Sequence, residues 1–250
     1  NSKIKIKRNK KDSMIKKYFL NFLKKIITFL NDRLKVKIQP LSPVELYYEE
    51  VFKNSYDAFK AFFKESYVFS DDNSIRSFAI NEAIKRFDNK NLFLEFGVFK
   101  GDSINLFANN LKKVDSKIIG FDSFEGLKDE WMTEHYNPAG TFNLKGKKPK
   151  VEKNVELIDG WVEDTIKKFF ENNSKKIAFI HLDLDTYKST AHVLKSLKRY
   201  FQPGTIILFD EFYGFPNWEK YEYKAFKEQI KEDEFKYIAF GTRQACIEII

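Results

Sequence analysis

The chain has 250 residues, of which 43% are hydrophobic and 32% are charged, and it contains a single cysteine, Cys246. One cysteine excludes an intramolecular disulfide framework and a multi-cysteine zinc site. No apolar run approaches the length that spans a bilayer, which excludes an integral membrane protein. We therefore expect one principal domain in a reducing cytoplasm, with at most peripheral membrane contact.

The formal net charge of +8 is concentrated at one end of the chain. Residues 1–37 hold thirteen Lys or Arg and two Asp, which leaves 31 of the 44 basic and 34 of the 36 acidic residues for the remainder. The basicity therefore belongs to an arm, and no specific nucleic-acid partner is expected. We predict an arm over residues 1–39 and a catalytic domain over residues 40–250.

The arm itself has two parts. Residues 1–13 are polar and basic enough to be disordered, whereas residues 14–34 place apolar side chains at helical spacing opposite lysines. Such a helix fits an anionic membrane surface or a partner. Packing on the domain, or on a second subunit of a homo-oligomer, is an equally good interpretation.

The domain begins after a break. Pro40 and Pro43 cannot lie inside one helix, and helical patterns follow over residues 44–64 and 74–87. The sheet is expected to start at residues 91–95. Gly97 and Gly101 then allow a sharp turn with close approach of a ligand, although Val98 and Phe99 break the dinucleotide-binding glycine pattern.

Two further strands end in acidic residues. The strand ending at Asp122 offers a carboxylate that can accept both hydroxyls of a ribose, or that simply caps the next helix. The strand over residues 154–158 is followed by Asp159, Gly160 and Trp161, and the indole of Trp161 either stacks on a purine or belongs to the core.

Residues 127–150 form a long segment without a sustained period, which is typical of a lid or a binding loop. His135, Tyr136 and Phe142 are its candidates for substrate contact. Packing within the loop is the alternative interpretation for each of them.

Two apolar strands, over residues 177–182 and 205–209, end in the pairs Asp183 with Asp185 and Asp210 with Glu211. The intervening helical segment is long enough for a crossover, so the strands should be parallel and their carboxyl ends should share one edge. Four acidic side chains would then converge. Capping of the following helices is the other interpretation.

The chain closes with a helix from Trp218 and two strands, over residues 235–240 and 246–250, joined closely enough for a hairpin. His181 lies in the apolar strand before Asp183, where a buried structural role competes with that of a base. His192 lies in the following helix, and we assign it no catalytic role.

Five segments in this order, LEFGVFKGDS, GFDSFEGL, LIDGWVEDT, HLDLDTYKST and PGTIILFDEF, resemble the macrocin O-methyltransferase family of class I S-adenosylmethionine-dependent methyltransferases. The resemblance extends over residues 78–250. It implies an α/β Rossmann-like fold with a seven-stranded, mostly parallel sheet, an antiparallel last strand and helices on both faces, here preceded by extra N-terminal helices. It also implies S-adenosylmethionine, magnesium or another divalent cation, and a saccharide hydroxyl as acceptor.

The resemblance assigns roles by position. For the cofactor it implies the residues Glu95, Gly97, Gly101, Ser103, Asp122, Ser123, Phe124, Asp159, Gly160 and Trp161. Asp183 matches the first metal ligand and Asp185 the general base, with His181 as the competing catalytic side chain. Asp210 and Glu211 match a metal-binding pair that relatives often write as Asp-Asp, so Glu211 is a departure.

The expected activity is metal-dependent O-methylation of a saccharide or glycosylated small molecule. An alcohol is a poor nucleophile at neutral pH and a carboxylate is a weak base for it, so a bound cation that acidifies the hydroxyl completes the chemistry. Methylation of a catechol-like diol poses the same chemical problem. A non-catalytic cofactor-binding protein, docked to membrane or nucleic acid by its basic arm, is the alternative outside this class.

Overall fold

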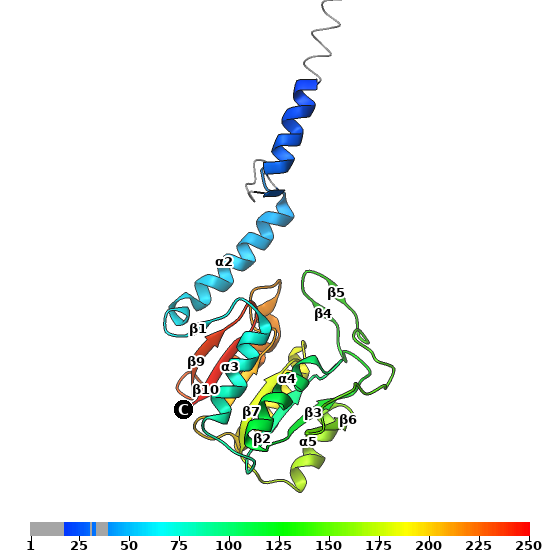
Figure 1. Cartoon of the computed structure of the whole chain (residues 1–250), viewed down its shortest axis with the longest axis vertical. Helices are drawn as coiled ribbons and strands as arrows, with labels where there is room; N and C mark the ends of the chain where they lie inside the picture. The colour runs from blue at the N-terminus through cyan, green and yellow to red at the C-terminus, as the bar shows by residue number, and fades with distance from the viewer. Residues whose placement is uncertain (1–17, 31, 34–39) are drawn as a thin grey trace, which may run out of the picture. The chain divides into compact units, whose positions relative to one another are not determined.

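The computed structural model describes residues 18–30, 32–33 and 40–250 (Figure 1). It divides into two compact units, residues 1–49 and 50–250. The predicted disordered segment, residues 1–13, lies outside the described residues, as does residue 39 at the predicted domain boundary. Residues 18–30 are helical, as predicted. Within the described part of the chain, no helix is both long and apolar enough to cross a membrane.

The larger unit is built on one sheet of eight strands in the order β1-β9-β10-β8-β7-β2-β3-β6. The strands are β1 (Tyr67–Val68), β2 (Leu92–Phe96), β3 (Ile118–Asp122), β6 (Val155–Asp159), β7 (Ile177–Leu182), β8 (Ile206–Phe209), β9 (Phe235–Phe240) and β10 (Ala245–Ile249). Only β10 is antiparallel to its neighbours, and it forms the predicted terminal hairpin with β9. The predicted strand number was wrong by one, because β1 is a two-residue edge strand, too short for a periodic signal.

Helices cover both faces of this sheet. They are α3 (Asp72–Ile84), α4 (Asp102–Leu111), α5 (Val162–Glu171), α6 (Tyr187–Leu197) and α7 (Glu222–Gln229), and α2 (Pro43–Phe63) precedes them in the chain. The central strands are apolar on both faces, as buried parallel strands must be. In β2, Leu94 and Phe96 point into the core beneath α5, α6 and α7, whereas Phe93 points into the core beneath α3 and α4.

α5 was not predicted, although its signal is present. Val162, Ile166 and Phe170 recur every four residues and are buried against the sheet. The pattern is short, because it lies between the motif that ends in Trp161 and the polar segment that starts at Glu171. α2 is anchored differently, through Phe59, whose ring is 2% exposed and packs among the aromatic rings that follow β8.

The strand order indicates at which edge of the sheet a ligand binds. β2 lies between β3 and β7 in the sheet, so the chain winds outward from β2 to β3 and β6 and then returns to the other side through β7. In such open sheets, ligands bind outside the carboxyl ends of the strands at this reversal point. All the acidic strand ends predicted from the sequence therefore meet at one edge.

The predicted lid, residues 127–150, folds back on itself above this edge. It contains a short hairpin of β4 (Trp131–Met132) and β5 (Tyr136–Asn137). At its base the N–H of Leu127 donates to the carbonyl of Thr141 and the N–H of Gly140 donates to that of Leu127, both at 2.8 Å. The two ends of this part of the loop are thus held together, and its Trp131 is buried.

Candidate functional site

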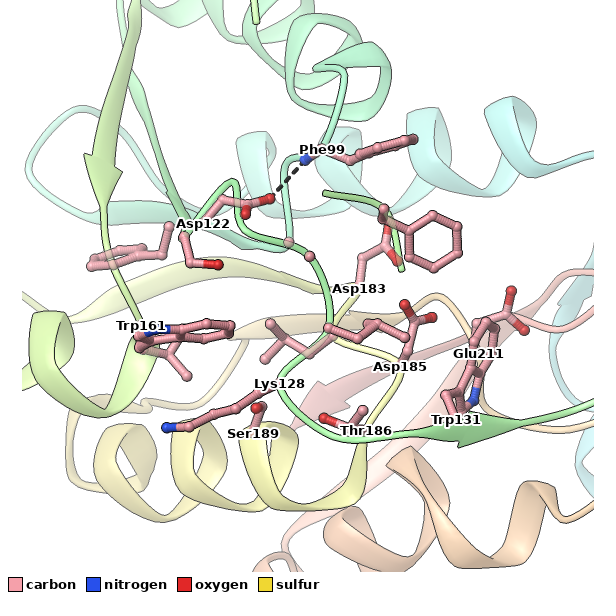
Figure 2. Close-up of a pocket in the computed structure, with 18 residues that line it drawn as sticks. Phe99, Asp122, Lys128, Trp131, Trp161, Asp183, Asp185, Thr186, Ser189 and Glu211 are labelled. Carbon is pink, nitrogen blue, oxygen red and sulfur yellow. Dashed lines mark hydrogen bonds between the residues drawn. The ribbon is translucent and has the colours of Figure 1, made fainter. Parts of the chain in front are cut away.

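One cavity, of about 320 Å³, opens at the carboxyl edge of the sheet beside the reversal point (Figure 2). This volume falls within the range of small-molecule sites. It is lined by Gly97, Phe99, Phe121, Asp122, Ser123, Gly126, Leu127, Lys128, Trp131, Phe142, Trp161, Val162, Asp183, Leu184, Asp185, Thr186, Ser189 and Glu211. The cavity thus joins the glycine turn, the lid and the ends of β7 and β8.

The floor of the cavity depends on Gly97. Its φ is +87°, and a Cβ atom there would lie 1.8 Å from the carbonyl oxygen of Asp183. The turn after β2 therefore passes directly over the end of β7, which only a residue without a side chain allows. This close approach brings the glycine turn and the acidic strand end into one wall.

Asp122 ties the glycine turn to the end of β3. Its Oδ2 accepts hydrogen bonds from the backbone N–H groups of Val98 and Phe99, each at 2.8 Å, and its Oδ1 accepts one from Phe124 at 2.7 Å. Figure 2 shows the bond from Phe99. A carboxylate has about four lone-pair positions, so Asp122 keeps capacity for a further donor. Its carboxylate faces the cavity, where the sequence predicted a ribose.

Trp161 and Lys128 form the wall at the same end of the cavity. The Lys128 Nζ lies 5.3 Å from the centre of the Trp161 ring and 3.1 Å from Glu163 Oε2. Figure 2 shows both side chains beside Ser189, at the opposite end of the cavity from Trp131 and Glu211. Trp161 therefore lines the cavity, as the cofactor interpretation required.

The other end of the cavity is acidic. Asp183, Asp185 and Glu211 lie there together (Figure 2). Asp185 is only 8% exposed and has a φ of +59°, a left-handed conformation that non-glycine residues seldom adopt outside functional sites. Burial and the charge of Asp210 raise the pKa of Asp185 to about 7. Burial, followed by the charges of its acidic neighbours, also raises the pKa of Asp183 well above its ordinary value.

Behind this end, Asp210 is held by a network of donors. Its Oδ1 accepts hydrogen bonds from Arg76 Nη2 at 2.7 Å and from Gln244 Nε2, and lies 3.2 Å from His181 Nε2. The other ring nitrogen of His181 lies 2.8 Å from Glu95 Oε1. With both nitrogens engaged and the ring fully buried, His181 supports Asp210 and is absent from the cavity wall.

The pKa values follow this network. Burial alone would raise the pKa of Asp210, but the hydrogen bond and charge of His181, together with Arg76, hold it below its usual value. Burial alone would lower the pKa of His181, but its bonds to Asp210 and Glu95 raise it. His181 thus lies between two carboxylates, Glu95 and Asp210, which stabilise its protonated form.

The carboxylates are also arranged in a way that suits a cation. Ligand atoms of His181, Asp183 and Asp210 all lie within 4.8 Å of one another. The predicted set had Glu211 in place of His181. Glu211 lines the cavity, but its carboxylate is drawn towards Arg243, with 3.5 Å between Oε2 and Nη1, and its pKa rises to about 8 through burial and the charge of Asp210.

The donor chemistry fits a hard divalent ion. The hydrogen bonds to Asp210 all end on Oδ1, which leaves Oδ2 for a ligand, and Asp183 supplies further oxygen atoms. Buried oxygen atoms of Glu95, Glu211 and Glu222 also have no hydrogen-bond partner among the described residues. Magnesium is typically bound by carboxylate oxygens that have no other positively charged partner.

Of the predicted cofactor residues, Gly97, Asp122, Ser123 and Trp161 line the cavity. The other six lie behind it or beside it: Glu95, Gly101, Ser103, Phe124, Asp159 and Gly160. Gly101 precedes α4 in a left-handed conformation, and Asp159 is exposed, with Oδ2 at 3.3 Å from Lys148 Nζ. Cofactor contact by these six residues remains a prediction.

Sequence reasoning missed several lining residues, of which Trp131 is the most informative. Its ring is 6% exposed, and its Nε1 is buried without a hydrogen-bond partner among the described residues. A tryptophan inside a suspected binding loop was the available signal. Of the named loop candidates only Phe142 reaches the cavity, while His135 and Tyr136 are exposed.

Residues 94–212 match the family model described as a methyltransferase domain. Among solved structures, the chain is similar to CalS11, described as a calicheamicin methyltransferase, with a TM-score of 0.57, 20% identity and 90% of each chain covered. It is also similar to the O-methyltransferase NovP, with a TM-score of 0.56, 16% identity and coverage of 71% of this chain and 78% of that one. No curated protein sequence matches it. The predicted class, an α/β Rossmann-like methyltransferase fold, is confirmed.

Proposed function

We propose that the chain transfers a methyl group from S-adenosylmethionine to a hydroxyl group of a saccharide or a glycosylated small molecule, with a divalent cation bound. The observation that carries this proposal is a single cavity with two chemically different ends, one aromatic beside Asp122 and the other acidic around Asp183 and Asp185. The matching methyltransferase model over residues 94–212 supports the reaction class.

The aromatic end suits the nucleoside of the methyl donor. The remaining acceptor capacity of Asp122 is available to a ribose hydroxyl, and Trp161 offers a ring face for adenine, since Lys128 lies over only one of its faces. Gly97 lines the same cavity and lets the turn after β2 pack against the end of β7. These residues bind and orient the donor and contribute no chemistry.

The acidic end suits the acceptor. In the proposed step the acceptor oxygen attacks the methyl carbon in line with the carbon–sulfur bond, an oxygen–carbon bond forms, and the electron pair of the broken bond stays on sulfur. The hydroxyl proton passes to the carboxylate of Asp185, which lines this end and belongs to neither the Arg76 nor the Arg243 ion pair, whereas Asp183 is assigned to the cation.

Asp183 and Asp210 are the side chains that would hold the divalent cation, with Glu211 beside them. When bound, the cation supplies a positive charge that makes the acceptor hydroxyl more acidic. The network of Arg76, His181 and Gln244 fixes the orientation of the Asp210 carboxylate, and with it the donor geometry of the site.

A saccharide acceptor is favoured by Trp131. Trp131 lines the acidic end of the cavity, where the apolar face of an indole suits the C–H face of a sugar. A second structure of CalS11, described as a TDP-rhamnose 3'-O-methyltransferase, has a TM-score of 0.53 to this chain and is 19% identical to it. The finer resemblance to macrocin O-methyltransferases rests on the sequence motifs.

Two measurements test the proposal. Titration calorimetry with S-adenosylhomocysteine should give saturable binding, and its failure would remove the methyltransferase assignment. Labelled S-adenosylmethionine with a panel of sugar nucleotides, free glycosides and catechols should then transfer label to sugar hydroxyls. Transfer to catechols alone would replace the acceptor class, and binding without any transfer would favour a non-catalytic protein.

A further inference from the structure

The helix over residues 18–30 is strongly two-faced. Nine of its thirteen residues are apolar, and at about 100° per residue they occupy one continuous arc of roughly 200°. Phe22, Ile26 and Phe29 lie within this arc, whereas Asn21 and Thr28 lie on the opposite face. The division between the faces is therefore complete over more than three turns.

The apolar face is largely uncovered. Seven of its nine residues are exposed, from 36% for Ile26 to 73% for Tyr18, with Phe22 at 60% and Phe29 at 59%, whereas Ile27 and Leu30 are half-buried. An isolated exposed leucine needs no explanation, but a continuous apolar stripe on a helix marks a binding surface. The stripe requires an apolar environment of some kind.

The charge around the stripe indicates which environment. Residues 18–30 contain Lys24 and Lys25 and no acidic residue, and residues 1–37 as a whole hold thirteen basic and two acidic residues. Anionic lipid headgroups attract such a segment by about 1 kcal/mol for each Lys or Arg near the surface. A protein groove with an acidic rim would need many carboxylates placed to match.

The width of the arc indicates the orientation. An arc of about 200° is wider than a coiled-coil seam, and it suits a helix that lies flat with its apolar half below the headgroups. Interfacial burial therefore accounts for the width of the stripe.

We propose that the helix over residues 18–30 lies in the plane of an anionic membrane surface and docks the chain there. The apolar face enters the boundary between headgroups and acyl chains, and Lys24 and Lys25 contact lipid phosphates. This inference is independent of methyl transfer, since the helix contributes no residue to the cavity.

The test uses the full chain and vesicle sedimentation, with vesicles of phosphatidylcholine alone or mixed with phosphatidylglycerol. The wild type should bind the mixed vesicles at least about tenfold more tightly than the neutral ones, and high salt should weaken that binding. The double variant Phe22→Ser with Phe29→Ser should lose about tenfold or more in affinity. The matched variant Asn21→Ser with Thr28→Ser, on the polar face, should bind like wild type.

Thermal unfolding and S-adenosylhomocysteine binding of the same variants should stay unchanged, which separates docking from folding and from the proposed activity. Equal losses in both double variants would overturn the proposal, as would equal binding to neutral and anionic vesicles. So would vesicle-independent self-association that Phe22→Ser with Phe29→Ser abolishes, because the stripe would then be an interface between copies of the chain.

Discussion

Asp185 combines an unusual backbone with a buried carboxylate that faces the cavity. Its φ of +59° fixes the direction of the side chain, and its position after β7 places it beside Asp183. If it accepts the hydroxyl proton, Asp185→Asn should lower turnover by about 10²- to 10⁴-fold, because an amide cannot take that proton. Asparagine tolerates a positive φ, so the fold should persist.

The readouts for this change are initial rates of methyl transfer and calorimetry with S-adenosylhomocysteine. Donor affinity should stay within about twofold. Asp233→Asn, an exposed carboxylate in the loop before β9, is the matched control and should leave both quantities unchanged. A fully active Asp185→Asn enzyme would remove Asp185 from the proposed step.

Asp122 is predicted to act at the donor end. Its two oxygens accept three backbone N–H groups from the turns after β2 and β3. Asp122→Asn replaces one oxygen with an N–H₂ group that faces a donor, which costs about 1–3 kcal/mol. We expect S-adenosylhomocysteine affinity to fall about ten- to a hundredfold by calorimetry. Unchanged affinity would show that the carboxylate serves neither the turn nor the ribose.

The junction between β2 and β7 depends on space as much as on backbone conformation. Gly97 and Gly140 have φ values of +87° and +84°, but a Cβ at Gly97 would lie 1.8 Å from a backbone carbonyl oxygen, whereas one at Gly140 would have nothing within 4 Å. Gly140→Ala should therefore cost about 1–2 kcal/mol of unfolding free energy from strain alone.

Gly97→Ala adds a collision that no rotamer change relieves, so we expect a loss above about 4 kcal/mol, or no folded protein. Urea unfolding of the two variants side by side measures the difference. If they were equally stable, the close approach of the two strand ends would be wrong, and with it the shared wall of the cavity.

The ends of β7 and β8 form the predicted cation site. Magnesium at about a hundred times its dissociation constant adds about 2.7 kcal/mol, which raises the unfolding midpoint of a chain this size by about 5–10 °C. Asp183→Asn should abolish this rise, and Asp233→Asn should preserve it. Chelator should stop methyl transfer and added magnesium should restore it. Full turnover in excess chelator would exclude a role for the cation.

The sequence predicted these elements well for a physical reason. Apolar runs that end in Asp122, Asp183 and Asp210 indicate buried parallel strands, and the carboxyl ends of such strands meet at one edge whatever the details of packing. The edge strand β1 was not predicted because its two residues are too few to show a period. The helix α5 was not predicted because its ten residues show the helical period only briefly.

What the sequence could not supply was the relation between side chains on different strands. Glu95 and His181 are 86 residues apart and become partners only through the register of β2 against β7. Likewise, whether Asp210 or Glu211 faces the cation depends on the positions of Arg76 and Arg243, which belong to other elements. Local pattern carries no information on such contacts.

The division of the chain into two units leads to the last prediction. Both hydrophobic cores draw their buried residues from Phe59 onward, and none comes from residues 18–30. A truncated chain of residues 40–250 should therefore unfold in urea within about 0.5 kcal/mol of the full chain and bind S-adenosylhomocysteine equally well.

The net charge of this truncated chain would be −3 instead of +8, because residues 1–37 carry an excess of eleven positive charges and residues 38–39 carry none. It should accordingly lose its attraction to anionic vesicles. Reduced stability of residues 40–250 would instead indicate that the N-terminal helix packs on the larger unit, and its apolar face would then be unavailable to a membrane.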